Sequence, residues 1–182
     1  MKNIKERDQS KGYIPLRLII RDNMFFKNYL EKFNDKKINI YIDMDGVVAD
    51  YDAINFKENK DKDNVYLNKR PVMSSINVLK EISIMENVTL NILSCTKRNN
   101  QKEGKFIWLS KYMNFIKKEN INLISREEKD YLKSALIKKE FLESHYNKDE
   151  INIIIDDSHD VLKEIEHSGL GIIPLHISSI LD

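Results

Sequence analysis

The sequence predicts a single α/β domain in which helices cover both faces of a five-stranded parallel sheet. From residue 37 onward, short apolar runs alternate with segments of helical periodicity. Strands that alternate with helices form parallel sheets through right-handed crossovers. The apolar runs are also rich in β-branched residues with few polar interruptions, which is typical of strands buried on both faces.

The first half of this alternation predicts two strands and two helices. Residues 38–42 (INIYI) and 88–93 (VTLNIL) are apolar runs of strand length. Residues 74–86 and 104–117 repeat apolar side chains every three or four positions, which favours helices with one face on the sheet. We therefore expect a strand–helix–strand–helix unit here.

The second half continues the same pattern. Residues 121–124 (INLI) predict a third strand, and residues 151–155 (INIII) a fourth. Residues 130–145 and 160–167 have helical spacing of apolar side chains. Residues 170–177 predict the fifth strand and close the sheet.

Residues 1–36 precede the alternation. Within them, residues 13–20 (YIPLRLII) resemble a strand, although proline argues against a central position in a sheet. Residues 22–33 have the spacing of an amphipathic helix. We expect this extension to pack on the core domain, residues 37–182, or to form an interface, including that of a homodimer.

Composition excludes several classes of protein. The chain of 182 residues has a net charge of +1, which gives no overall electrostatic reason to expect a membrane or a long nucleic acid as partner. No segment approaches the roughly 20 apolar residues of a membrane span. Cys95 is the single cysteine, so an intramolecular disulfide is impossible. With no apolar signal segment at the N-terminus, we expect a cytoplasmic protein.

Polar residues that can do chemistry follow three of the expected strands. Asp43 and Asp45 follow the first, Ser94 the second, and the pair Asp156 and Asp157 the fourth. Ligands of parallel sheets bind beyond the carboxyl ends of the strands, so we expect these side chains to converge. Taken alone, the stretch IDMDGVVADY at 42–51 also fits a metal site, a proton donor, a nucleophile or a solvated turn.

The stretch DMDGVVAD at residues 43–50 resembles the first motif of the haloacid dehalogenase-like (HAD) phosphohydrolases and is most similar to that of the 5′(3′)-deoxyribonucleotidases. The segments NILSCT, KFIWL, SREEK and IIIDDSHD resemble further segments of those enzymes. The resemblance covers roughly residues 37–180. It implies a HAD-like Rossmannoid three-layer sandwich that uses Mg²⁺ as its cofactor.

The resemblance also implies residue roles. Asp43 would be the nucleophile, and Asp45 the acid and base. The expected Mg²⁺ ligands are Asp43, Asp45 (through its backbone carbonyl), Asp156 and Asp157. The expected substrate contacts are Ser94, Lys105, Arg126 and Lys129. Three choices stay open: Thr96 in place of Ser94, Lys102 in place of Lys105, and which residue of the acidic pair binds the metal directly.

The deoxyribonucleotidases carry a helical cap between their first two motifs, and here residues 51–73 allow only a reduced one. Candidates for stacking a base are correspondingly few: Tyr51, Phe56 and Tyr66. We expect a Mg²⁺-dependent phosphomonoester hydrolase that forms an aspartyl-phosphate on a small substrate, a 5′-(deoxy)nucleotide. The alternatives are a phosphatase for another small metabolite or a nucleic-acid end, and a non-catalytic phosphate-binding or regulatory module.

Overall fold

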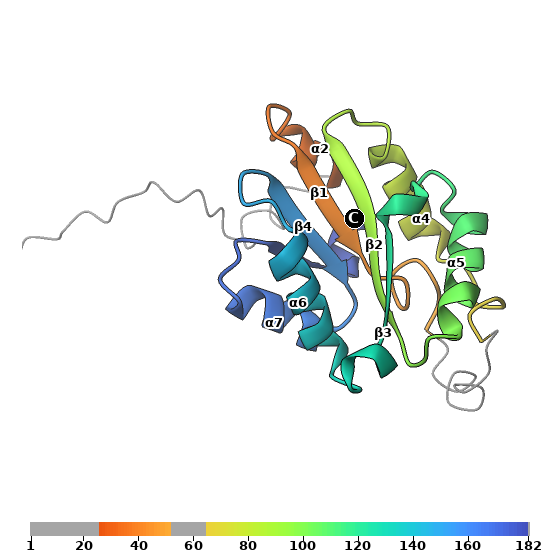
Figure 1. Ribbon diagram of the computed structural model, residues 1–182. Coiled ribbons are helices and arrows are strands. Elements are labelled where there is room, and N and C mark those ends of the chain that lie inside the picture. The colour runs from red at the N-terminus through yellow and green to blue at the C-terminus, as the bar shows by residue number, and fades with distance from the viewer. Residues whose placement is uncertain (1–25, 52–64, 182) are drawn as a thin grey trace, which may run out of the picture.

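The computed structural model describes residues 26–51 and 65–181 of the chain. Its centre is a five-stranded, fully parallel sheet with the strand order β3-β2-β1-β4-β5, which confirms the predicted fold class (Figure 1). The strands are β1 (Ile38–Ile42), β2 (Val88–Thr96), β3 (Ile121–Ser125), β4 (Ile151–Asp156) and β5 (Ile173–His176). β1 therefore occupies the middle of the sheet.

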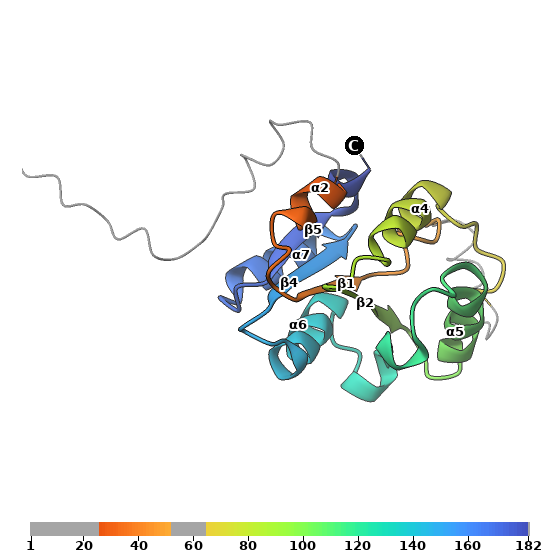
Figure 2. The same ribbon diagram turned by 90° about the horizontal axis from the view of Figure 1, so that it is seen from above.

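Helices cover both faces of the sheet, as Figure 2 shows from above. The helices are α2 (Phe26–Glu31), α4 (Met73–Ile82), α5 (Gln101–Tyr112), α6 (Ser134–His145) and α7 (His159–His167), and the short 3-10 turns are η1 (Lys118–Asn120), η2 (Glu127–Lys129) and η3 (Ile177–Ile180). Side chains of α2, α4 and α5 form one hydrophobic cluster with Ile40 and Ile42. Side chains of α6 and α7 form a second cluster with Tyr41 and Ile154 on the opposite face. No helix of the described residues is long and apolar enough to cross a membrane.

Helix α2 is the described part of the N-terminal extension. Phe26, Tyr29 and Leu30 are buried in the first hydrophobic cluster. Residues 1–25, which include the expected strand at 13–20, lie outside the described residues. The division of the chain at residue 36 stays a prediction.

The segment that follows the first motif is described only at its two ends, because residues 52–64 of the expected reduced cap lie outside the described residues. Its second end returns to the motif. Ala49 forms an isolated antiparallel bridge with Pro71, and the backbone N–H of Asp50 donates to the carbonyl of Arg70. This return places residues 65–71 beside the carboxyl end of β1.

Most element boundaries differ from the sequence prediction by a few residues, and three of the differences concern residues near the carboxyl end of the sheet. β2 extends to Thr96, because β3 pairs with its end through the register Thr96↔Ser125. Helix α5 begins at Gln101, so Lys105 lies in its second turn. The helix expected over 130–145 begins only at Ser134, since Asp130 and Tyr131 adopt left-handed backbone angles that a right-handed helix cannot include.

Candidate active site

The carboxylates of Asp43, Asp156 and Asp157 meet beyond the carboxyl ends of β1 and β4. One oxygen atom from each lies within 4.8 Å of the others. Asp43 extends β1, and its backbone N–H donates to the carbonyl of Ile155 in β4. Register between the two strands therefore brings the first motif and the acidic pair together, as the sequence predicted.

Gly46 makes room for Asp157. Its φ angle is +75°, and a Cβ atom built on it would lie 2.0 Å from Oδ2 of Asp157. Any side chain at this position would both strain the backbone and displace the carboxylate. The glycine of the first motif therefore has a steric function, which is to let the acidic pair approach.

Lys138 binds two of these carboxylates and was not among the residues that the sequence predicted. Its Nζ lies 2.8 Å from Oδ1 of Asp43 and 2.6 Å from Oδ2 of Asp156, and its side chain is almost fully buried. Burial alone would lower the pKa of Lys138, but the charges of Asp43 and Asp156 raise it well above its usual range. Lys138 is therefore a permanently charged group beside the predicted nucleophile.

The acidic pair itself resists ionisation. Burial raises the pKa of Asp156 to about 6; the ammonium of Lys138 opposes this rise and the charge of Asp43 adds to it. Burial, followed by the charge of Asp43, also raises the pKa of Asp157. Both shifts have the same two causes: burial, which is the larger, and the nearby negative charge of Asp43.

Asp45 lies in a different electrostatic environment. Its Oδ2 lies 2.6 Å from Nζ of Lys105, and its Oδ1 lies 2.7 Å from Nζ of Lys69. Burial would raise the pKa of Asp45, but the charges of Lys105 and Lys69 outweigh it and leave the pKa below its ordinary value. The two aspartates of the first motif therefore have separate partners.

Ser94 and Lys105 lie behind the two aspartates and have no exposed surface. Besides binding Asp45, Nζ of Lys105 donates to Oγ of Ser94 at 2.7 Å and to the carbonyl of Cys95 at 2.8 Å. The alternatives differ: Lys102 pairs with Glu128 at 2.6 Å, and the hydroxyl of Thr96 donates to the carbonyl of Arg98. The structure thus brings Ser94 and Lys105 to the site.

Two predicted substrate contacts, Arg126 and Lys129, do not join this group. The guanidinium of Arg126 donates to the carbonyls of Tyr131 and Leu132, and Lys129 pairs with Glu140 at 3.2 Å. Neither side chain lines the cavity that contains Asp43. Both residues belong to the loop between β3 and α6.

The structure describes two of the three candidates for stacking a base, and of these two Tyr51 suits that use. Tyr51 is 54% exposed, whereas Tyr66 is buried and its ring faces the ammonium of Lys105 at 4.7 Å. Phe56 lies outside the described residues. Tyr66 therefore supports the lysine instead of offering a surface to a ligand.

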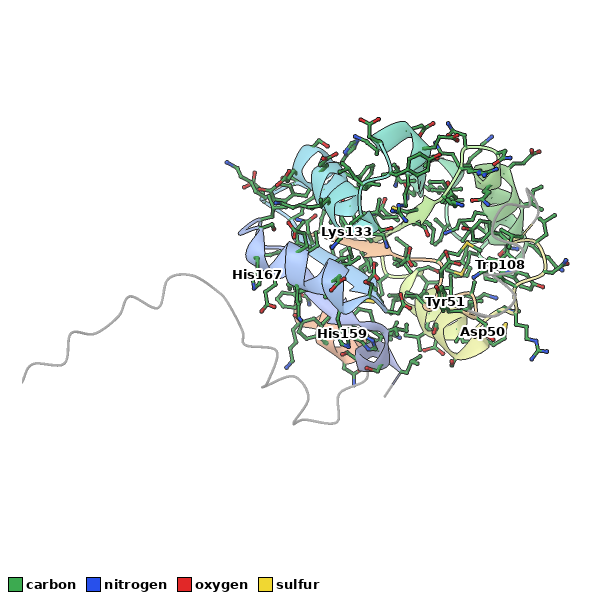
Figure 3. All side chains as sticks on the ribbon, turned by 90° about the horizontal axis from the view of Figure 1, so that it is seen from below. Asp50, Tyr51, Trp108, Lys133, His159 and His167 are labelled. Carbon is green, nitrogen blue, oxygen red and sulfur yellow. The ribbon has the colours of Figure 1, made fainter. Side chains whose placement is uncertain are left out.

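A cavity of about 430 Å³ opens above the acidic groups. Its lining consists of Asp43, Asp45, Tyr51, Cys95, Ser134, Lys138, Asp156, Asp157, Ser158 and Val161. Ser134 is the first residue of α6 and Ser158 precedes the first residue of α7, so the N-termini of two helices border the cavity. Helix N-termini attract anions. Figure 3 views this face from below, with Tyr51 and Lys133 labelled on different sides of it.

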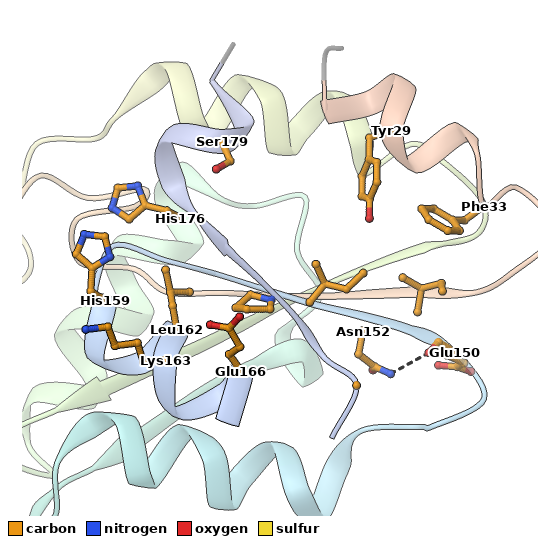
Figure 4. A pocket seen from close by; sticks show the side chains of 14 residues that line it. Tyr29, Phe33, Glu150, Asn152, His159, Leu162, Lys163, Glu166, His176 and Ser179 are labelled. Atoms are coloured by element: carbon orange, nitrogen blue, oxygen red, sulfur yellow. Dashed lines mark hydrogen bonds between the residues drawn. The ribbon is translucent and has the colours of Figure 1, made fainter. Parts of the chain in front are cut away.

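A second cavity, of about 360 Å³, lies along the β5 edge of the sheet (Figure 4). α2 contributes Tyr29 and Phe33 to its wall, and α7 contributes His159, Lys163 and Glu166. The lining of this second cavity contains both acidic and basic side chains. Among residues 26–51 and 65–181, the acidic residues that lie close enough together to share one metal ion are Asp43, Asp156 and Asp157 of the first cavity.

The charges of the first cavity fit a divalent cation. Three carboxylates against the ammonium of Lys138 leave a formal charge of −2 around Asp43. Carboxylate oxygens are the ligands that Mg²⁺ prefers. The absence of a side chain at Gly46 leaves room for the third of these carboxylates, that of Asp157. The residues present therefore suit Mg²⁺, with Asp43 and the acidic pair as side-chain ligands.

Sequence reasoning missed Lys138 and Lys69 for different reasons. Lys138 lies on the buried face of α6, in line with Ala135 and Leu142. A lysine within an apolar stripe was the available signal, because burial of an unpaired ammonium is too costly to occur without an acidic partner. Lys69 lies in a charged stretch at 57–70 without periodicity, where nothing distinguishes it from its neighbours.

Comparison with known families gives one match. The family model described as the polynucleotide kinase PNKP phosphatase domain matches residues 37–176. None of the curated proteins matches the chain.

Solved structures share the fold. In the structure of the Pnkp1/Rnl/Hen1 RNA repair complex, one chain is 22% identical with a TM-score of 0.60, and the match covers 78% of this chain and 42% of that one. A second Pnkp1/Rnl/Hen1 structure gives 21% identity and a TM-score of 0.58, covering 78% and 46%. The HAD domain of the effector protein Lem4 from Legionella pneumophila gives 16% identity and a TM-score of 0.44, covering 77% and 84%. The chain thus spans less than half the length of the two RNA repair proteins.

Proposed function

Because the chain belongs to the family of polynucleotide kinase PNKP phosphatase domains within the HAD proteins, we propose that it is a Mg²⁺-dependent phosphatase that acts on phosphorylated ends of nucleic acids. One observation carries the proposal: Asp43 lies in a cavity together with Lys138 and the acidic pair, Asp156 and Asp157. A nucleophile, a fixed positive charge and a place for a divalent cation are the parts that phosphoryl transfer requires.

In the first half of the proposed reaction, a carboxylate oxygen of Asp43 attacks phosphorus. An aspartyl-phosphate forms as the bond from phosphorus to the leaving oxygen breaks. Asp45 first takes up a proton from solvent, which its low pKa opposes, and gives that proton to the leaving oxygen, which departs as the hydroxyl of the nucleic-acid end. Asp45 lies two residues after the nucleophile and lines the same cavity, which suits it to this role.

In the second half, water hydrolyses the aspartyl-phosphate. Asp45, now a carboxylate, removes a proton from the attacking water, and inorganic phosphate leaves. The low pKa of Asp45 suits this step, since the carboxylate form is the base. Lys105 and Lys69, the latter in the segment 65–71, each form an ion pair with one carboxylate oxygen of Asp45. Lys105 is in turn positioned by its hydrogen bond to Ser94.

Lys138 and the two helix N-termini are suited to the phosphoryl group itself. Lys138 already lies 2.8 Å from the oxygen of Asp43. The N-termini at Ser134 and Ser158 add partial positive charge at the rim of the cavity. We assign phosphate binding to these groups, and to Ser94 and Lys105 the orientation of Asp45.

The metal would be held by the side chains of Asp43 and Asp157 and the backbone carbonyl of Asp45, with Asp156 as a further ligand or as support. When bound, Mg²⁺ neutralises charge that builds up on the phosphoryl oxygens and on the attacking carboxylate. The formal charge of −2 on the acidic side of the cavity supports this assignment.

The choice of a nucleic-acid end over a free nucleotide rests on the family. The deoxyribonucleotidase subtype that the first motif suggested has no support from the comparisons, whereas the matching family is that of a polynucleotide kinase's phosphatase domain. A nucleic-acid end also suits the site because Tyr51, which lines the cavity, is exposed and could contact a base.

A substrate panel tests the proposal. Purified protein is given Mg²⁺ and p-nitrophenyl phosphate, oligonucleotides phosphorylated at the 3′ or the 5′ end, or the nucleoside monophosphates, and phosphate release is measured with and without chelator. We expect hydrolysis of at least one type of oligonucleotide end with a kcat/KM well above that of every mononucleotide. A higher kcat/KM on mononucleotides would instead indicate a nucleotidase. The absence of turnover of every phosphomonoester would favour a phosphate-binding module.

A further inference from the structure

The loop between β3 and α6, residues 126–133, is built around Arg126. Its Nε donates to the carbonyl of Leu132 at 2.9 Å, and its Nη2 donates to the carbonyl of Tyr131 at 3.0 Å. In return, the backbone N–H of Tyr131 donates to the carbonyl of Arg126 at 2.7 Å. Arg126, which the sequence suggested as a substrate contact, thus fixes the backbone of Tyr131.

This loop holds two consecutive non-glycine residues in left-handed conformation. Asp130 has a φ of +50° and Tyr131 a φ of +55°. Such angles cost free energy and persist only where the surroundings enforce them, which happens preferentially at functional sites. Tyr131 does not repay this cost by burial, since its side chain is 52% exposed. The loop therefore presents an aromatic ring to solvent.

The loop lies at the edge of the sheet that carries the acidic cavity. It follows the carboxyl end of β3, and Figure 1 shows η2 at the same end of the sheet at which β1 and β4 terminate. Three residues after Tyr131, Ser134 lines the cavity itself. A substrate whose phosphate enters the cavity would extend its next groups over this rim.

Charge on this side of the molecule favours a polyanion. The loops that follow β2 and β3, residues 97–100 and 126–133, contain five lysines and arginines against three aspartates and glutamates, a formal charge of +2. Two of these three acidic residues connect the loops after β2 and β3, since Glu127 accepts from the N–H of Asn99 and Glu128 pairs with Lys102. The two loops thus form one basic rim.

We propose that Tyr131 is a stacking platform for the nucleobase of the terminal nucleotide. This inference rests on the proposed function and narrows it to single-stranded or frayed ends, whose bases can leave the helix. Aromatic side chains beside a positively charged groove are how proteins bind single strands without reading sequence. Arg126 is then a positioning residue that acts through the loop.

The test compares kcat/KM for two oligonucleotides with phosphorylated ends, one normal and one whose terminal nucleotide lacks its base. Wild type, Tyr131→Ala, Tyr131→Trp and Ile84→Ala are measured, with p-nitrophenyl phosphate as a substrate that has no base. Ile84 is 78% exposed and lies between α4 and β2, at the amino end of the strands, so its truncation is a matched control.

We expect Tyr131→Ala to lower kcat/KM on the normal end by about tenfold, which is the size of one base–aromatic stack. Tyr131→Trp and Ile84→Ala should keep the wild-type value. The abasic end should be hydrolysed equally by wild type and Tyr131→Ala, and p-nitrophenyl phosphate should show no difference between any of the proteins.

Three results would overturn the inference. Equal kcat/KM of wild type and Tyr131→Ala on the normal end would show that Tyr131 does not stack on the base, and the proposed substrate would still stand. An equal loss on p-nitrophenyl phosphate would show that Tyr131 only supports the fold of the site. A wild type that hydrolyses p-nitrophenyl phosphate but no oligonucleotide end would instead overturn the proposed substrate, and the subsite with it.

Discussion

Gly46 and Asp157 lie so close together that a single added carbon on Gly46 would stand 2.0 Å from the carboxylate of Asp157. A residue of the first motif thereby sets the position of a residue more than a hundred positions later in the chain. A substitution at Gly46 therefore has two costs, which are the strain of its left-handed backbone and the displacement of Asp157, a proposed metal ligand.

Gly46→Ala should weaken Mg²⁺ binding by at least about tenfold, because Asp157 must move. Gly169→Ala is the matched control, since Gly169 has a φ of +72° and no atom within 4 Å of an added Cβ. Left-handed strain should cost both variants about 1 kcal/mol of stability. Isothermal titration with Mg²⁺ and urea unfolding measure the two effects, and equal Mg²⁺ affinity of the two variants would contradict the steric account.

Lys138→Met should destabilise the metal-free protein by about 3 kcal/mol, because the carboxylates of Asp43 and Asp156 stay buried without their cation. Lys139→Met removes the next residue of the same helix, whose side chain makes surface ion pairs, and should cost less than about 0.5 kcal/mol. Chemical denaturation in chelator compares the two. Added Mg²⁺ should restore part of the stability of Lys138→Met, by supplying positive charge to the same carboxylates.

The two aspartates of the first motif should fail in different ways. Asp43→Asn should abolish turnover of p-nitrophenyl phosphate, since no nucleophile is left. Asp45→Asn should slow turnover by roughly 10²- to 10⁴-fold and accumulate phosphorylated protein, because p-nitrophenolate leaves without a proton while hydrolysis lacks its base. Intact-mass spectrometry detects the added phosphoryl group.

Asp50→Asn is the control for this pair, because Asp50 is an exposed carboxylate of the same motif. It should keep wild-type turnover. Phosphorylated protein in Asp43→Asn, or none in Asp45→Asn, would argue against the assigned roles.

Tyr66 should make stability depend on pH in the alkaline range. Burial raises the pKa of Tyr66 to about 12, whereas a tyrosine of the unfolded chain titrates near pH 10. The folded state therefore holds the phenolic proton more tightly, and this contribution is complete below about pH 10 and lost as the pH rises to about 12. At about pH 11 the wild type should have lost about 1 kcal/mol more, relative to pH 9, than Tyr66→Phe.

Urea unfolding at the two pH values measures this difference, and Tyr131→Phe serves as the control at an exposed tyrosine. The same alkaline loss in wild type and Tyr66→Phe would show that other groups cause it.

The fold and half of the site follow from sequence for a common physical reason. β1, β2 and β4 are apolar runs that end in polar residues, and parallel strands bring such ends to one edge. The order of residues alone is therefore enough to predict that Asp43, Asp156 and Asp157 are neighbours. These three residues lie at the ends of strands, and the end of a buried strand can be recognised in a sequence as the point where an apolar run stops.

The positions of Lys138 and Lys69 in the site are harder to predict, because these residues belong to a helix and a loop and not to the end of a strand. Lys138 reaches Asp43 only because α6 packs on the sheet with one particular face, and Lys69 reaches Asp45 only because residues 65–71 return beside β1. Arg126 illustrates the same limit: the resemblance suggested it as a substrate contact, and the partners that the structure gives it are backbone carbonyls. Spacing along a chain does not specify which face of a helix packs inward or which acceptors a guanidinium finds.

The strand order has a consequence for how the protein opens. All three strands that carry reacting groups are flanked on both sides by another strand, while β3 and β5 form the margins. Local opening of a sheet begins at its margins, so amides of β3 and β5 should exchange with deuterium sooner than those of β1. The loop after β3 belongs to that margin, so its opening should leave the centre of the sheet, where Asp43 follows β1, in place.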